Sequence, residues 1–106
     1  MSTTLMNTTI IHITFAELCE LERIESDILI ELVGHGIVTP VSGQLATDWV
    51  FETNAVPWIK KAVRLAGDLE LDWVAVALVI DLMQQKEALE RENQNYRLQL
   101  ERFIER

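Results

Sequence analysis

The last third of the chain, residues 72–106, has the sequence DWVAVALVIDLMQQKEALERENQNYRLQLERFIER. It contains no Gly and no Pro. It is rich in Ala, Leu, Gln, Glu, Lys and Arg, whose side chains lose little conformational entropy when they enter a helix. Asp72 stands where an N-cap accepts a free backbone N–H, and Arg102 and Arg106 place positive charge at the negative end of the dipole. We therefore expect one helix of roughly 50 Å, longer than the core of so small a chain is wide.

The apolar residues divide this helix into two parts. Residues 73–83 are apolar on every side, so we expect this part to be buried in a core. From Leu89 onward they narrow to a stripe with a seven-residue repeat, but polar residues such as Gln85 and Glu92 interrupt the second row that a long coiled coil needs. We expect a short antiparallel or slanted pairing of two copies, and the alternative is a solvated, frayed helix end. The expected dimerisation residues are Leu82, Leu89, Tyr96, Leu100 and Phe103.

Composition and charge narrow the class of protein. With 106 residues, 49% of them apolar, the chain has room for a single domain with its own core. The 17 Asp and Glu residues against 9 Lys and Arg give a net charge of −8, which repels phosphate and anionic lipid. We therefore expect neither a nucleic-acid nor a membrane partner, and a basic protein partner is favoured. The single Cys19 and the lack of a signal-like start indicate a cytoplasmic protein.

The chain before the long helix begins with strand and capping signals. Residues 8–14 are rich in β-branched side chains and predict a short strand after a loose terminus. Thr14 and Glu17 have the spacing of a capping box, so we expect a helix over residues 15–21. Ser26 begins a second helix, which the Gly34-His35-Gly36 turn ends. Two short helices joined in this way predict a helix-turn-helix.

A small β wing is predicted after the second helix. Ser42-Gly43 supplies a turn and residues 47–51 a return strand, so we expect a hairpin over residues 41–51. Thr53 then caps a third helix that tolerates Pro57 and ends at Gly67. The predicted fold is mainly α: a winged helix-turn-helix over residues 8–67, followed by a linker and long dimerisation helix over residues 68–106.

The charge of the helix-turn-helix argues against DNA binding. A DNA-binding second helix carries Arg, Lys, Asn or Gln on its outer face, whereas this one offers Asp27 and Glu31. Residues 14–36 hold six acids and one base, a local charge of −5. This surface is either a solvated face that keeps the protein soluble or a docking surface for a basic helix. The one basic cluster, Lys60, Lys61 and Arg64, is interpreted as a solvated or ion-paired helix face.

The sequence gives no support to enzyme chemistry. Cys19 lies among apolar neighbours and is interpreted as a buried structural thiol. Gly34-His35-Gly36 follows a helix instead of opening one, so it does not fit a phosphate loop. His12 has no Cys, His or carboxylate at metal-ligand spacing. We therefore expect no catalytic residue, no cofactor and no metal.

Several short motifs share the order found in a known family. They are TFAELC at residues 14–19, GIVTP at 36–40, WVF at 49–51 and RL at 64–65. This order resembles the N-terminal domain of MerR-type regulators. In that family an Arg-Tyr-Tyr run before the glycine contacts DNA, whereas the corresponding places here hold Ile30, Glu31 and Leu32. The resemblance implies a MerR-like fold without these DNA-contacting residues.

A closer resemblance covers about nine-tenths of the chain. It is carried by TFAELC at residues 14–19, ELVGHGIVTP at 31–40, WVF at 49–51 and RLAGDLELDWVAVAL at 64–78. This combination resembles the chaperone modulatory proteins, the CbpM family. The resemblance implies a non-enzymatic, homodimeric regulator that binds the J-domain of CbpA, a DnaJ-type co-chaperone, and blocks its stimulation of the DnaK chaperone.

The residue chemistry agrees with that implied function. J-domains present a basic helix to DnaK, so an inhibitor that competes for this helix should be acidic. Asp68, Glu70 and Asp72 form a second acidic candidate group, although Asp72 also suits an N-cap. The alternatives are a MerR-type DNA-binding transcriptional regulator and a dimerising adaptor with an unrelated basic partner. The expected partner-binding residues are Glu20, Glu25, Asp27, Glu31 and His35.

Overall fold

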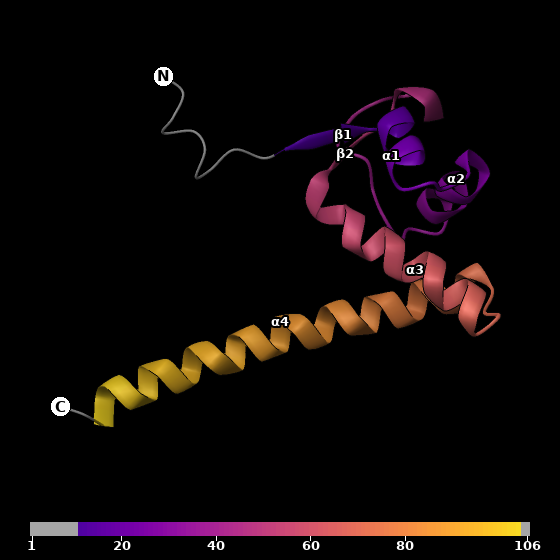
Figure 1. Cartoon of the computed structure of the whole chain (residues 1–106). Helices are drawn as coiled ribbons and strands as arrows, with labels where there is room; N and C mark the ends of the chain where they lie inside the picture. Colours follow the sequence, from indigo (N-terminus) through magenta and orange to yellow (C-terminus); the bar gives the residue numbers. More distant parts are fainter. Residues whose placement is uncertain (1–10, 105–106) are drawn as a thin grey trace, which may run out of the picture.

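A computed structural model describes residues 11–104, which form a head of short elements and one long helix that extends away from it (Figure 1). The elements are β1 (His12–Thr14), α1 (Phe15–Leu21), α2 (Ser26–Gly34), the 3₁₀ helix η2 (Ala46–Asp48), β2 (Val50–Glu52), the 3₁₀ helix η3 (Thr53–Ala55), α3 (Val56–Asp68) and α4 (Trp73–Ile104). The predicted mainly α class with a long C-terminal helix is confirmed. We call residues 11–68 the head. The part of the predicted first strand before residue 11 lies outside the described residues.

Local hydrogen bonds define the two short helices at the places the sequence predicts. The Glu17 N–H donates to Thr14 Oγ1 at 3.1 Å, and Glu17 Oε1 accepts from the Thr14 N–H at 2.9 Å, so the capping box is formed. At the end of α1 the Ile24 N–H donates to the Cys19 carbonyl at 3.1 Å, and Arg23 between them has a φ of 55°. Gly36 plays the same part after α2, with a φ of 75°. Each of the two short helices is therefore followed by a left-handed residue that closes its C-terminus.

The predicted hairpin over residues 41–51 forms only at its base, and its predicted turn and most of its return strand are wrong. Strand β2 pairs antiparallel with β1, with Ile13 opposite Phe51, and residues 46–48 form η2 instead of a return strand. The other side of β2 has a single bridge, between Ser42 and Val50, so the wing is a loop closed at its base. Within this loop a side chain at Gly43 would collide with the Asp48 carbonyl, so the close approach of these two residues requires a glycine.

The predicted N-cap role of Thr53 is also wrong. Thr53 opens η3, and its N–H donates to the Ile11 carbonyl at 2.9 Å, extending the β1–β2 pairing by one bond. Helix α3 begins three residues later at Val56, with Pro57 in its first turn as expected, and no side-chain cap bond forms at Ala55. It ends at Asp68, one residue beyond the predicted Gly67.

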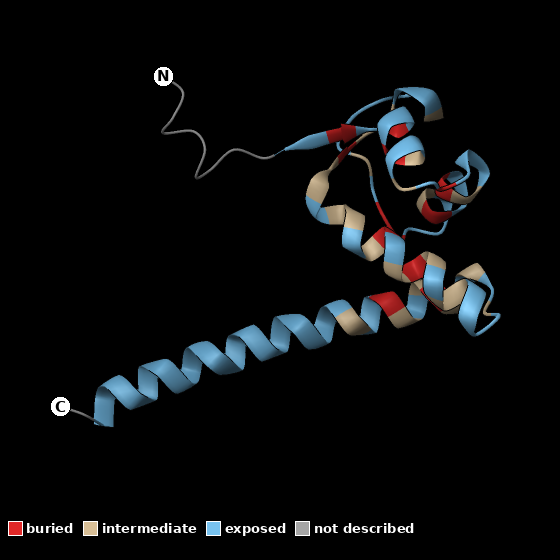
Figure 2. Ribbon diagram, viewed as in Figure 1, coloured by how far each residue is buried: buried red, intermediate tan, exposed pale blue. Residues whose placement is uncertain are grey.

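The core lies in the head and continues under the start of α4, as the buried residues in Figure 2 show. Trp49 is half-buried and packs edge-to-face with both Phe15 and Phe51, with ring centroids 6.0 and 6.2 Å apart. This contact links the wing to α1 and β2. The buried residues are Ile13, Phe15, Leu18, Ile24, Leu29, Leu32, Ile37, Val38, Phe51, Ile59, Ala62, Val76 and Ile80.

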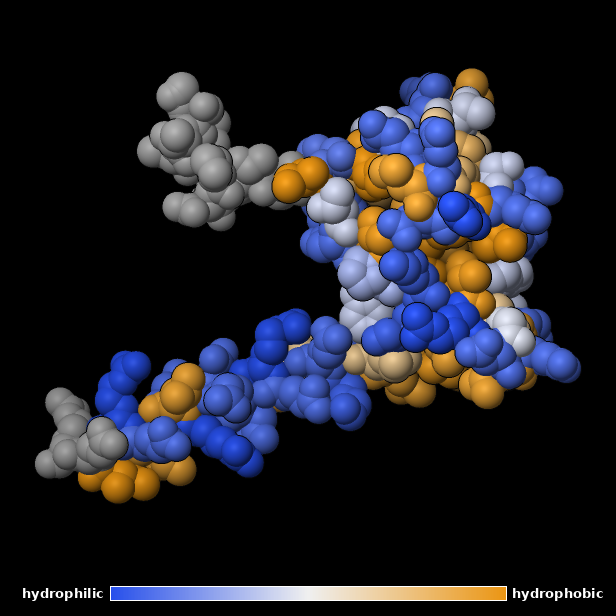
Figure 3. All heavy atoms as spheres, in the orientation of Figure 1, coloured by the Kyte–Doolittle hydropathy of each residue, from blue (hydrophilic) through white to orange (hydrophobic). Residues whose placement is uncertain are grey.

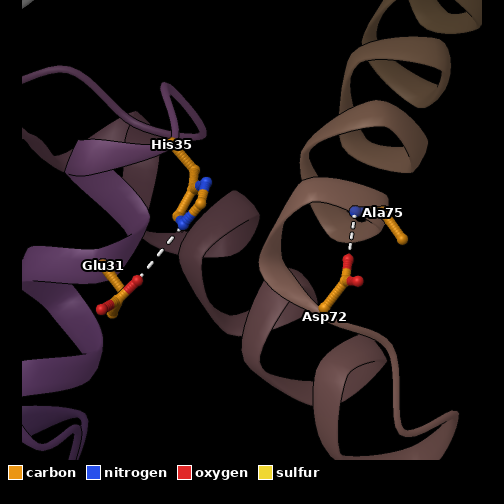
Figure 4. Close-up of polar contacts among 4 residues, drawn as sticks. All are labelled: Glu31, His35, Asp72 and Ala75. Atoms are coloured by element: carbon orange, nitrogen blue, oxygen red, sulfur yellow. Dashed lines mark hydrogen bonds and ion pairs between the residues drawn. The ribbon is translucent and has the colours of Figure 1, made fainter.

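Helix α4 is 32 residues long. It begins as predicted, and Figure 4 shows the contact between Asp72 and Ala75 at its first turn. Asp72 Oδ1 accepts a hydrogen bond from the Ala75 N–H at 2.8 Å, which confirms the N-cap. The prediction that residues 73–83 are buried on every side is wrong for the single chain. Only Val76 and Ile80 are buried, on the side that packs on α3, while Val74 and Leu78 are 68% and 61% exposed. The head therefore covers one face of α4 and leaves its other apolar face in solvent.

Candidate partner-binding site

The outer surface of α2 carries three of the five predicted partner-binding residues in one row. Asp27, Glu31 and His35 are four residues apart in sequence, which places them on one side of the helix and its C-cap. All three are exposed, and the inward side of the same helix holds the buried Leu29 and Leu32. Because the apolar side of α2 packs into the core, the row on its opposite side faces the solvent.

His35 and Glu31 contact each other within the row. His35 Nε2 lies 3.2 Å from Glu31 Oε1, as the close-up in Figure 4 shows. His35 is the C-cap of α2, and its backbone N–H donates to the Glu31 carbonyl at 3.0 Å. Glu31 therefore contacts both the main chain and the side chain of His35. These two contacts fix the position of the imidazole ring at the end of the row.

The remaining two predicted residues are exposed outside this row. Glu25 is the N-cap residue of α2 and Glu20 is on α1, and both are exposed. Within residues 11–104 neither carboxylate, nor that of Asp27, takes part in an ion pair. We call Glu20, Glu25, Asp27, Glu31 and His35 the acidic surface. Its unpaired carboxylates are available to a basic partner.

One apolar residue of this surface was not predicted. Ile30 on α2 is 41% exposed, between the acidic row and the buried side of the helix. Sequence reasoning placed it only as one of the positions that depart from the MerR pattern. An apolar side chain beside charges supplies short-range contact area that charges alone do not.

The basic cluster on α3 is divided between two structural roles. Lys60 Nζ lies 3.4 Å from Glu22 Oε1, and Lys61 Nζ lies 4.9 Å from the centre of the Trp58 ring. These contacts join α3 to the end of α1 and cover an indole face. Arg64 is exposed and, within residues 11–104, in no ion pair, so the cluster combines an ion-paired and a solvated part.

The predicted dimerisation residues lie on one exposed stripe of α4. Leu82, Leu89 and Tyr96 recur every seven residues, and each is more than half exposed. With about 3.6 residues per turn, the exposed Val74 and Leu78 fall on this same side, opposite the buried Val76. Apolar atoms gather near the free end of the helix (Figure 3). The α4 stripe comprises Val74, Leu78, Leu82, Leu89, Tyr96, Leu100 and Phe103.

The described part of the chain offers little support for a metal site, a reactive thiol or a membrane-spanning helix. Residues 11–104 contain no group of three or more His, Cys, Asp or Glu side chains that could hold a metal ion. Cys19 is half-buried, and burial raises the pKa of its thiol, which lowers its reactivity. No helix among these residues is both long and apolar enough to cross a membrane.

Comparison with known proteins agrees with the fold. Residues 13–98 match the model of a family described as MerR HTH family regulatory protein. That match spans nearly all of the head and most of α4, so it includes the helix-turn-helix, the wing loop and the long helix as far as residue 98. The fold and the comparison together define the class as MerR-like winged-helix regulators.

Individual relatives narrow this class. The chaperone modulatory protein CbpM of Pseudomonas putida strain F1 is 38% identical over 99 residues, which cover 93% of this chain and 97% of that protein. CbpM of Pseudomonas entomophila is 37% identical over the same share of each chain. CbpM of Escherichia coli O1:K1 is 38% identical over 91 residues, 86% of this chain and 89% of the relative. The chain therefore belongs to the CbpM family of chaperone modulatory proteins, a name that describes no enzymatic reaction.

Proposed function

We propose that the protein is a non-enzymatic regulator that binds the J-domain of a CbpA/DnaJ-type co-chaperone and inhibits its stimulation of the DnaK chaperone. The observation that carries this proposal is the acidic row on the outer side of α2. A MerR-type DNA reader uses this helix to enter the major groove, whereas here it exposes Asp27 and Glu31. The fold thus keeps a rigid recognition helix whose charge suits a basic protein helix.

The acidic surface supports recognition by two effects. Exposed charges mainly speed the encounter and select a partner of opposite charge, and salt screens them over a Debye length of about 8 to 10 Å. Ile30 beside the row offers apolar contact that persists when salt removes the long-range attraction. We therefore expect binding that weakens with salt without disappearing.

Charge reversal tests the surface directly. The double variant Asp27→Lys with Glu31→Lys should weaken J-domain binding by about tenfold or more, because like charges then face each other across the interface. The control is Glu87→Lys with Glu101→Lys, which reverses two exposed acids on α4. Calorimetric titration gives both affinities, and circular dichroism shows whether each variant is folded. An unchanged affinity in the folded Asp27/Glu31 variant would remove this surface from the proposal.

The second acidic group is a weaker candidate for the same role. Asp72 is engaged as the N-cap of α4, and Asp68 is the last residue of α3. Replacing Asp72 would therefore change helix stability and binding together. Reversing Asp68 alone should leave J-domain affinity unchanged, and a large loss would move the binding site to the end of α3.

We also propose that two copies pair through the α4 stripe. The stripe places apolar residues along the whole length of one side of the helix, with polar interruptions such as Gln85 and Lys86, and the head covers only the opposite side. Exposed apolar side chains that recur along one side of a helix mark an interaction site in a protein that is otherwise acidic. A homodimer would bury the stripe of each chain against the other, and it would complete the burial that sequence reasoning expected for residues 73–83.

A DNA-binding regulator is the alternative function, favoured by the MerR-type family match. Non-specific affinity for DNA is mostly electrostatic, so it should be strongest at low salt. A mobility-shift experiment with duplex DNA at low ionic strength separates the two functions. No shift is expected, since the net charge is −8 and the α2 row is acidic.

A further inference from the structure

A groove in the head shares Glu25 with the acidic surface, but its lining includes no residue of the row Asp27, Glu31 and His35 and none of the α4 stripe. It runs between the turn that joins α1 to α2 and the outer side of α3, and its volume is about 440 Å³. Ile24, Ile28 and Val63 form its apolar part, and Arg23, Lys60 and Arg64 stand around them. We call this the basic groove. Its combination of apolar surface and cations suits a segment that presents an apolar side chain between carboxylates.

The charge of the groove is opposite to that of the whole chain. Its three bases outnumber the two acids that also line it, Glu22 and Glu25. Lys60 is held by Glu22 at 3.4 Å, but within residues 11–104 Arg23 and Arg64 are in no ion pair. Two guanidinium groups are thus free for a carboxylate, which they bind in a planar, two-point geometry.

Arg23 is held at the groove in a costly conformation. Its φ of 55° is left-handed, at the position after α1 where a helix end favours Gly. The equivalent position after α2 is a glycine, Gly36. Strained non-glycine residues of this kind cluster at binding sites. The left-handed φ of Arg23 is therefore consistent with a binding role for this residue, for which the guanidinium group at the groove is the chemical basis.

The chain itself exposes a segment with the complementary chemistry. Residues 68–72, DLELD, alternate acids with leucines, and we call them the acidic linker. Leu69 is 60% exposed between Asp68 and Glu70. Glu70 also has a left-handed φ, of 52°. The acidic linker of the same chain does not line the basic groove, so both surfaces remain uncovered in a single copy.

The two surfaces are arranged to fit a second copy. Along α3 the bases Lys60 and Arg64 come first and Asp68 comes at the end. When two such helices lie antiparallel, the basic half of each meets the acidic end of the other. A two-fold interface uses the same patch on both copies, so the contact forms twice. We propose that the basic groove binds the acidic linker of a second copy of this chain, with the partner's Leu69 on Ile24, Ile28 and Val63.

This contact is independent of the proposed α4 pairing, and the experiment separates them. The full chain carrying Leu89→Glu places a charge in the α4 stripe and disfavours the α4 dimer. Sedimentation equilibrium of this background, over concentrations up to about 1 mM, should still show a monomer–dimer association. A background chain that stays monomeric over the whole range overturns the proposal, whatever the wild-type chain does.

Charge exchange between copies gives the sharper test. In the same background, Arg64→Glu alone and Asp68→Lys alone should each weaken self-association by about tenfold or more. A mixture of the two variants should recover it, because every groove then meets a linker of opposite charge. The matched control Arg91→Glu, on the side of α4 away from the stripe, should change nothing. Failure of the mixture to recover, or loss in the control, overturns the assignment. Leu69→Ser, which leaves the charges intact, should also weaken association and replaces Arg64→Glu if that variant does not fold.

Discussion

Leu89 lies in the middle of the α4 stripe, and Leu89→Ala measures how much the stripe contributes to pairing. Leu89 is 63% exposed in the single chain. Since full burial of a leucine is worth about 1.5–3 kcal/mol, covering the exposed part contributes about 1–2 kcal/mol per chain and about 2–4 kcal/mol per dimer. This corresponds to a dissociation constant raised by up to about 30- to 700-fold. Sedimentation equilibrium measures it directly.

The same helix supplies a matched control. Leu98 is 49% exposed and lies nine residues from Leu89, which places it on roughly the opposite side of α4. Leu98→Ala removes the same atoms from a surface outside the stripe, so it should leave the dissociation constant unchanged. Equal effects of Leu89→Ala and Leu98→Ala, or no effect of either, would refute the proposed interface.

Three further predictions concern the head. Thr14→Ala removes one bond of the capping box and should lower the stability of folding by about 1 kcal/mol, seen as a Tm lower by about 4–8 °C in thermal circular dichroism. Arg23→Gly relieves a left-handed φ and should raise the Tm by a few degrees, about 0.5–1 kcal/mol, while weakening association through the basic groove. Burial raises the pKa of the Cys19 thiol, so iodoacetamide should react more slowly with the folded chain than with the chain in urea. Because the folded chain keeps this proton to a higher pH than the unfolded chain, stability should fall as the pH rises through about 8.5, and Cys19→Ser should remove that component.

Helix ends were predictable because their signals are local. Thr14 and Glu17 are three residues apart, and both bonds of the capping box form within that span. Asp72 caps α4 in the same way, through the Ala75 N–H. Such signals depend on a few neighbouring residues, so the sequence alone carries them.

Pairing between distant segments was not predictable in the same way. The Ser42-Gly43 turn and a return strand over residues 47–51 suggest a hairpin, but β2 pairs chiefly with β1, which lies much earlier in the chain. The strand pattern is satisfied equally well by either neighbour. The error at Thr53 has the same cause. Its N–H donates to the carbonyl of Ile11, which is too far away in the sequence for local capping rules to include.

The candidate site also combines features that local sequence patterns predict with features that depend on the three-dimensional arrangement. The exposure of Asp27 and Glu31 follows from the amphipathic pattern of α2, and the structure places them as expected. The Glu31–His35 contact, the exposed Ile30 and the left-handed Arg23 depend on backbone geometry at helix ends and on what neighbouring elements cover. The pattern of apolar residues in α4 predicts burial on every side, whereas α3 covers only one side of the helix. Periodicity identifies the apolar residues, but it does not show which of them another element of the head covers.

The most direct test of the proposed function is calorimetric titration of the full chain against the isolated J-domain of a CbpA-type co-chaperone, at low and at high salt. We predict binding near one J-domain per chain, with an affinity that falls as salt screens the acidic surface. The absence of heat at both salt concentrations, together with the absence of a complex on gel filtration, would contradict it.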